Sequence, residues 1–210
     1  MTDPFDGALQ HPGELREFYD AAMERAVRKD IGRLDEMAQR LIAAAPMLFI
    51  ATYSAEGQVD VSPRGGQPGF VTVLDEHNLA IPDATGNRRL DTLENVVESQ
   101  RAAVLFVIPG RDTTLRINGR ACVTAQPELL ERLTPVGKPP RTAIVLEAKE
   151  VYAHCAKAFV RSKLWDRGSW PDPSCLPTPA EVSVAHQRDP DWSVEQEEQR
   201  IAEALLYRLD

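Results

Sequence analysis

Two adjacent arginines, Arg88 and Arg89, stand at the expected start of a helix. Apolar residues recur at helical spacing from Leu90 to Val97, and Asn87 is a favourable N-cap residue. Positive charges in a first helical turn oppose the helix dipole, at a cost of about 0.3–1 kcal/mol each. A phosphate removes this cost, because the free backbone N–H groups and the dipole at a helix start both attract anions. The pattern therefore indicates an anion site, and the alternative is a solvated basic turn offset by neighbouring carboxylates.

Two other segments carry polar groups that we expect to converge on this helix start. The segment Asp60–Gly66 ends a predicted strand with polar side chains and glycines. The segment Thr114–Gly119 places Arg116 and Asn118 on the polar face of another strand, since they alternate with apolar residues. Arginine suits anion binding because its planar fork can hold two oxygens at once.

Composition excludes several classes of protein. The 210 residues carry a net charge of −8 and a pI near 5.1, which argues against a nucleic-acid binder or a binder of anionic membranes. No apolar run approaches the roughly 18–20 residues of a membrane span. The three cysteines and four histidines are scattered, so we expect neither disulfides nor a metal site. The N-terminal residues do not have the pattern of a signal peptide, and we expect a cytoplasmic protein.

Periodicity predicts a mainly β fold with helical additions. Short strands joined by turns indicate a closed or partly closed antiparallel barrel. We expect N-terminal helices packed on the barrel over residues 1–45, the barrel over 46–165, and a proline-rich loop with a C-terminal helix over 166–210. The predicted helices are 14–29, 33–45, 87–100, 127–133, 156–165 and one after 193, and the predicted strands are 47–53, 58–62, 70–74, 79–82, 102–108, 115–123 and 144–152. Residues 63–69, with three glycines and two prolines, are expected to form a loop.

Six short motifs follow one another in an order that resembles the FMN-binding split β-barrel proteins of the pyridoxamine 5′-phosphate oxidase-like superfamily. The motifs are Asp60–Gly65, Gly69–Val71, Ile81–Asp83, Gly86–Leu93, Phe106–Gly110 and Thr114–Gly119. The resemblance covers about residues 47–165. It implies a six-stranded antiparallel split barrel and a homodimer with two flavins at its interface.

The resemblance also implies which residues bind the cofactor. Arg64, Arg88 and Arg89 match the places that hold the flavin phosphate, with Asn87 and Ser62 as polar supports. The residues whose backbone would lie along the isoalloxazine edge are Val61, Ser62, Pro63, Arg64, Ile81, Pro82 and Asp83. Arg116 and Asn118 would reach the same cofactor or the phosphate of the second subunit. The alternative for Arg116 is a surface residue paired with Asp112.

The segment after the last predicted strand differs from the vitamin oxidase itself. The C-terminal arginine and histidine of that enzyme have no match here, because the tail is an acidic amphipathic helix. Instead, Lys157 and Arg161 are four residues apart and share a helical face, which would suit an anionic substrate or the flavin phosphate. Trp165 would stack beside the flavin or pack in the core. Cys155 is expected to be a small buried residue rather than a nucleophile.

These observations favour an FMN-dependent oxidoreductase that acts on a small molecule. Two alternatives share the same barrel: a reductase that uses the deazaflavin F420, and a non-catalytic protein that binds flavin or haem. Fold alone does not distinguish them. The residues do not identify the substrate, the electron donor or a catalytic side chain.

Overall fold

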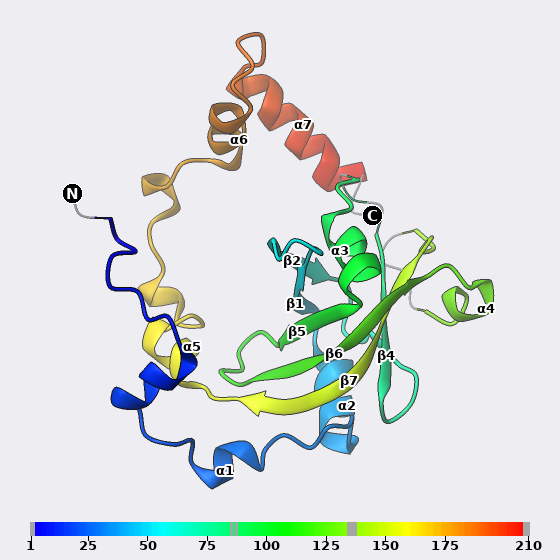
Figure 1. Ribbon diagram of the computed structural model, residues 1–210. Coiled ribbons are helices and arrows are strands. Elements are labelled where there is room, and N and C mark those ends of the chain that lie inside the picture. Colours follow the sequence, from blue (N-terminus) through cyan, green and yellow to red (C-terminus); the bar gives the residue numbers. More distant parts are fainter. Residues whose placement is uncertain (1–2, 85, 87, 134–137, 208–210) are drawn as a thin grey trace.

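The centre of the molecule is one antiparallel sheet. In the computed structural model, which describes residues 3–84, 86, 88–133 and 138–207, seven strands follow the order β2-β1-β5-β6-β7-β4-β3 (Figure 1). Their bounds are Met47–Tyr53 (β1), Val59–Gly65 (β2), Thr72–Val73 (β3), Asn78–Pro82 (β4), Arg101–Val107 (β5), Thr114–Thr124 (β6) and Ala143–His154 (β7). The predicted mainly β fold with added helices is confirmed. We expect six barrel strands, but across the described residues the sheet has seven strands and is not closed, because the two-residue β3 pairs there only with β4.

Helices precede, interrupt and follow the sheet. The α-helices are Glu24–Val27 (α1), Glu36–Ala44 (α2), Asp91–Ser99 (α3), Pro127–Leu130 (α4), Lys157–Ser162 (α5), Pro179–Gln187 (α6) and Val194–Tyr207 (α7). Three short 3₁₀ helices span Pro12–Glu17, Arg167–Ser169 and Pro173–Cys175. Helix α2 begins where the Asp35 carboxylate accepts a hydrogen bond from the Ala38 amide at 2.8 Å, as an N-cap residue does.

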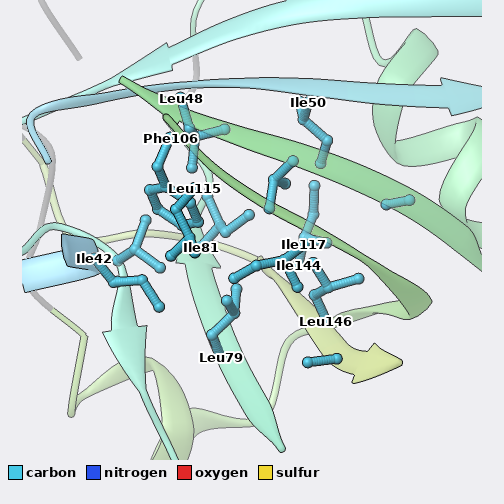
Figure 2. Close-up of a cluster of buried hydrophobic side chains, with 14 of the residues drawn as sticks. Ile42, Leu48, Ile50, Leu79, Ile81, Phe106, Leu115, Ile117, Ile144 and Leu146 are labelled. Atoms are coloured by element: carbon cyan, nitrogen blue, oxygen red, sulfur yellow. The ribbon is translucent and has the colours of Figure 1, made fainter. Parts of the chain in front are cut away.

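The hydrophobic core lies on one face of the curved sheet, which we call the inner face. Leu48, Phe106 and Leu115 are paired in register across β1, β5 and β6, and all three are buried (Figure 2). Ile42 of α2 closes the core from the side. Because side chains alternate along a strand, residues of the opposite parity lie on the other face of the sheet, the outer face.

The N-terminal segment differs from its prediction. The continuous helix expected over residues 14–29 is wrong: the chain forms a 3₁₀ turn, an irregular stretch and the four-residue α1. The predicted apolar face includes Phe18 and Tyr19, which are 66% and 69% exposed. An isolated helix of this length is marginal in water when its apolar face has no surface to pack against.

Strand β2 is longer than predicted, because it includes residues that were expected to start a loop. Pro63 lies within β2, opposite Phe49 of β1. Since β2 is at the end of the sheet and pairs with β1 alone among the described strands, one side of its backbone has no strand partner there. Proline is accepted at such an edge because it has no N–H group to donate.

The C-terminal helices α6 and α7 form a hairpin that stands apart from the sheet in Figure 1 and contacts mainly itself. Glu197 of α7 is fully buried in it. Its carboxylate accepts hydrogen bonds from the Ser183 hydroxyl at 2.6 Å and the Trp192 indole at 3.0 Å, and it is paired with Arg200 at 2.6 Å. The hydrogen bond from Arg200 contributes most, and together with those from Ser183 and Trp192 it holds the pKa of Glu197 at about 2, below its usual 4.5. Within the described part of the chain, no helix is long and apolar enough to cross a membrane.

Candidate functional site

The two ends of the sheet are joined by an ion pair. Arg64 lies on β2 at one edge, and Asp83 follows β4, next to the other edge. The Nη1 atom of Arg64 is 2.7 Å from Oδ1 of Asp83, and the two side chains are 20% and 15% exposed. Arg64 pairs in register with the buried Leu48, so its side chain belongs to the inner face. We call the opening between β2 and the β4-β3 end of the sheet the split, and the pair lies there.

The guanidinium of Arg64 is incompletely satisfied. Its Nε atom is buried and has no hydrogen-bond acceptor among the described residues. A buried donor without an acceptor costs about 1–3 kcal/mol. An anionic oxygen at this position would satisfy Nε, and arginine binds phosphate and carboxylate oxygens in this way. The chemistry of Arg64 thus fits an anionic group such as a cofactor phosphate.

The two arginines that precede α3 are not in its first turn. The helix begins at Asp91, with Leu90 at the N-cap position, and Asn87 lies outside the described residues. The prediction of a helix from residue 87 is therefore wrong. Arg88 has a φ of 63°, a left-handed conformation that an α-helix does not accept.

Both arginines are exposed at the surface. Arg89 is paired with Asp91 at 2.7 Å, so a carboxylate of the same turn offsets its charge. The expected conflict with the helix dipole does not arise. Arg88 and Arg89 remain close in sequence to Asp83, on the segment that leads away from the ion pair at the split.

Two hydrogen bonds fix helix α3 against the sheet, and the sequence pattern predicts neither of them. The Thr92 hydroxyl of α3 donates to Oδ2 of Asp60 on β2 at 2.7 Å. The buried Asn95 amide donates to the Thr52 hydroxyl of β1 at 3.1 Å. The first bond attaches α3 to β2, the strand that carries Arg64, and the second attaches it to the neighbouring strand β1. No local motif signals them, because the paired residues are 32 and 43 positions apart.

The other predicted cofactor contacts on β2 and β4 differ in exposure. Val61 and Pro63 point to the outer face and are exposed, whereas Ser62 is half-buried on the inner face with Arg64. The side chains of Ile81 and Pro82 are buried, so only their backbone is available. The Asp83 amide already donates to the Thr142 carbonyl at 3.0 Å.

Arg116 and Asn118 lie on the face opposite Arg64. Arg116 is paired with Leu105, and it adjoins the inward-pointing Leu115. Its Nε atom donates to Oδ1 of Asn118 at 3.1 Å, and its guanidinium stands over the Tyr152 ring, 5.6 Å from the centroid. These contacts, rather than the alternative partner Asp112, hold Arg116. Within one chain, Arg116 and Arg64 therefore lie on opposite faces of the sheet.

Helix α5 is attached to the turn between β5 and β6. The Trp165 indole donates to the Arg111 carbonyl at 3.0 Å, and its ring lies 5.9 Å from that of Phe159. Lys157 and Arg161 are exposed on α5 and remain available to an anion. The prediction that Cys155 is buried is wrong: its side chain is exposed, because it lies in the connection between β7 and α5.

Among the residues described, no group of three or more histidine, cysteine, aspartate or glutamate side chains is arranged to hold a metal ion.

Comparison with known families identifies the class of protein. The family model described as pyridoxamine 5′-phosphate oxidase matches residues 34–155, which is more than half of the chain. The matched region runs from Leu34, two residues before α2, to Cys155, the residue after β7, and it includes Arg64, Asp83, Arg88, Arg89 and Arg116. The chain belongs to this family.

Solved structures with similarity to this chain come from several bacteria. HupZ of Group A Streptococcus is 16% identical, with a TM-score of 0.46 over 57% of this chain and 92% of its own. A Clostridium acetobutylicum protein of the pyridoxinephosphate oxidase family is 13% identical, with a TM-score of 0.42 over 56% and 85%. An FAD-binding protein of Mycobacterium smegmatis is 10% identical, with a TM-score of 0.40 over 59% and 97%. No curated protein sequence matches this chain significantly.

Proposed function

We propose that the protein is an FMN-dependent oxidoreductase that acts on a small molecule. The observation that carries this proposal is Arg64, a half-buried cation at the split of the sheet whose Nε has no acceptor among the residues that the structure describes. It lies within the region that belongs to the pyridoxamine 5′-phosphate oxidase family. Membership of this family and an unsatisfied arginine at the sheet edge together favour a phosphorylated flavin over an unphosphorylated ligand.

Each basic residue has a defined task in this proposal. Arg64 would bind the cofactor phosphate through Nε, while its Nη1 remains on Asp83 and keeps the guanidinium in place. Arg88 and Arg89 would add positive charge from the segment before α3. Lys157 and Arg161 would supply a second cationic surface on α5. When bound, FMN would supply a ring that exchanges hydride or single electrons with a substrate.

We further propose a homodimer with the cofactor near the contact between the subunits. The support is the outer face of β1 and β2, where Tyr53, Val59 and Val61 are 43%, 82% and 63% exposed. Neighbouring apolar side chains at this exposure are typical of a contact surface between proteins. A second copy of the chain would cover them.

The first experiment is the absorption spectrum of freshly purified protein, followed by mass analysis of any compound released by heat. Two flavin bands and the mass of FMN would support the proposal. A single absorption band together with the mass of F420 would identify the cofactor as the deazaflavin instead of FMN. A Soret band would favour the haem-binding alternative. Protein that is colourless and gains no band when FMN is added would contradict the proposal.

The role of Arg64 is tested by Arg64→Gln and Arg64→Lys, with Arg25→Gln as the control for a lost surface charge. Arg25 is exposed on α1. Because a hydrogen bond to a charged group contributes about 1.5–3 kcal/mol, Arg64→Gln is expected to weaken FMN binding about 10- to 100-fold. Arg64→Lys keeps the positive charge but lacks the planar guanidinium, so the loss of FMN affinity should be smaller than that of Arg64→Gln. FMN affinity is measured by quenching of flavin fluorescence, and the fold by circular dichroism. Unchanged affinity in both folded Arg64 variants would refute this site.

A further inference from the structure

A second pocket lies on the outer face of the sheet, away from the split. It has a volume of about 390 Å³, within the range of small-molecule sites. Its floor is formed by β1, β5 and β6, and one wall is formed by the start of α5. The register places Arg116 of this pocket and Arg64 of the split on opposite faces of the sheet. The two regions are therefore separate within one chain.

Most of this pocket is apolar. Phe49 and Leu105 line its floor, and Phe159 lines the side formed by α5. Phe159 is braced by the Trp165 ring, whose indole is itself bonded to the Arg111 carbonyl. The rings of Phe49 and Phe159 both line the pocket. They favour a flat, apolar ligand, since aromatic rings gain free energy from stacked or edge-to-face contacts.

One strongly polar group interrupts the apolar lining. Arg116 is half-buried, and its position is fixed by the hydrogen bond to Asn118 and by the Tyr152 ring. Asn118 is in turn held by the Glu150 carboxylate, so this acid is engaged with the amide rather than with the guanidinium. The terminal nitrogens of Arg116 have no hydrogen-bond or ion-pair partner within the described parts of the chain. A pre-positioned arginine fork with free donors is suited to a carboxylate.

Two more polar side chains line the same pocket. Thr114 is two positions before Arg116 on β6 and is only 5% exposed, and His154 is its partner in register on β7. Both side chains share the outer face with Arg116, because alternate residues and residues paired in register lie on one side of a sheet. The polar groups are thus gathered on β6 and β7, while the aromatic rings come from β1 and α5.

We propose that this pocket binds a small aromatic carboxylate. The carboxylate lies on the terminal nitrogens of Arg116, and the ring lies against the apolar lining formed by Phe49 and Leu105 of the floor and Phe159 of the wall. This site does not depend on a flavin, and it goes beyond the proposed function because it assigns a ligand class to the other face of the sheet.

The test uses Cys155, which is exposed and lines the pocket. Alkylation of the purified full-length protein by N-ethylmaleimide is followed by mass spectrometry with and without benzoate. Benzoate is expected to slow the modification of Cys155, while Cys122 and Cys175, both exposed and outside the pocket, serve as references in the same molecule. Benzamide, which has the same shape without the charge, should protect far less.

Arg116→Gln and Arg120→Gln form the matched pair of variants. Arg120 is exposed on the same strand and the same face, but it does not line this pocket. Arg116→Gln is expected to raise the benzoate concentration that protects Cys155 about 10- to 100-fold, the range for loss of a charged hydrogen bond. Arg120→Gln should leave it unchanged, and circular dichroism checks that both variants are folded.

Three results would overturn the proposal: no protection by millimolar benzoate, equal protection of folded Arg116→Gln, and a Cys155 that does not react even without ligand. The measurement is repeated with FMN alone. Protection of Cys155 by FMN would assign the pocket to the cofactor instead. Because the assay needs no flavin, a protein that binds no FMN but shows Arg116-dependent protection would refute only the proposed function.

Discussion

Gly119 offers the most stringent test of the sheet itself. The register between β6 and β7 shifts at Asn118 and Gly119, and the backbone of β7 approaches Gly119 closely there. A Cβ atom added to Gly119 would lie 1.8 Å from the Glu147 carbonyl oxygen, and relieving this to an ordinary contact of 3.4 Å requires a movement of 1.6 Å (3.4 − 1.8). The obstacle is backbone held in a ladder of hydrogen bonds, so it cannot rotate away as a side chain would.

Gly119→Ala is therefore expected to be strongly destabilising. Overpacking in a well-packed region costs about 1–3 kcal/mol, and a clash with backbone belongs at the upper end, about 3 kcal/mol. For a chain of this size the melting temperature should fall by about 6–12 °C. Urea unfolding followed by circular dichroism measures the loss.

The control is Gly13→Ala. An added Cβ at Gly13 has no atom of the described residues within 4 Å, so a change within about 0.5 kcal/mol is expected. A folded Gly119→Ala variant whose free energy of unfolding falls by less than about 1 kcal/mol would show that β6 and β7 do not approach this closely.

Two further predictions concern the C-terminal hairpin and the proposed dimer. The Glu197 carboxyl has a pKa of about 2 in the folded protein and about 4.5 when unfolded, so its contribution to hairpin stability is complete above pH 4.5 and is lost as the pH falls toward 2. Fluorescence of Trp192, whose indole donates to Glu197, should report this transition, and a transition that persists unaltered in Glu197→Gln would contradict it. Light scattering should give twice the 23.3 kDa of one chain. Val61→Asp is expected to lower that mass. Val97→Asp, at a residue of similar exposure on α3, is the control and should leave the mass unchanged. A protein that stays dimeric with each of the two substitutions would exclude this contact surface.

Most of the strands could be predicted because their burial follows their hydrophobic pattern. The apolar run Met47–Tyr53 forms β1 with the predicted bounds, and the alternation in β6 does place Leu115 and Ile117 inside and Arg116 outside. These signals are local, since a strand with one buried face shows a two-residue period whatever its partners are.

The errors arose where a local rule was overridden by the position of a segment in the fold. The local pattern predicts a loop at Pro63 and Gly65, but β2 is an edge strand and accepts them. Tyr19 fits a helical stripe, yet it meets no surface that would bury it. A stripe indicates a helix only if another element covers it.

The candidate site was less predictable than the strands. Arg64 was selected from sequence, but its partner Asp83 was assigned only a backbone role, because a contact across the split depends on the curvature of the whole sheet. The separation of Arg64 from Arg116 likewise requires the register of four strands, from β2 through β1 and β5 to β6. A single sequence contains neither piece of information.

The ion pair between Arg64 and Asp83 has a consequence for the motion of the sheet. Elsewhere, neighbouring strands are held by series of backbone hydrogen bonds that break together, whereas a side-chain pair bridges the split. This seam can widen through rotation of two side chains, with every strand ladder intact. In the proposed complex, the phosphate on Nε and Asp83 on Nη1 hold the same guanidinium through different nitrogens, so phosphate binding and closure of the seam are thermodynamically coupled. The part of the sheet that moves most easily is thus the part that we propose binds the cofactor phosphate.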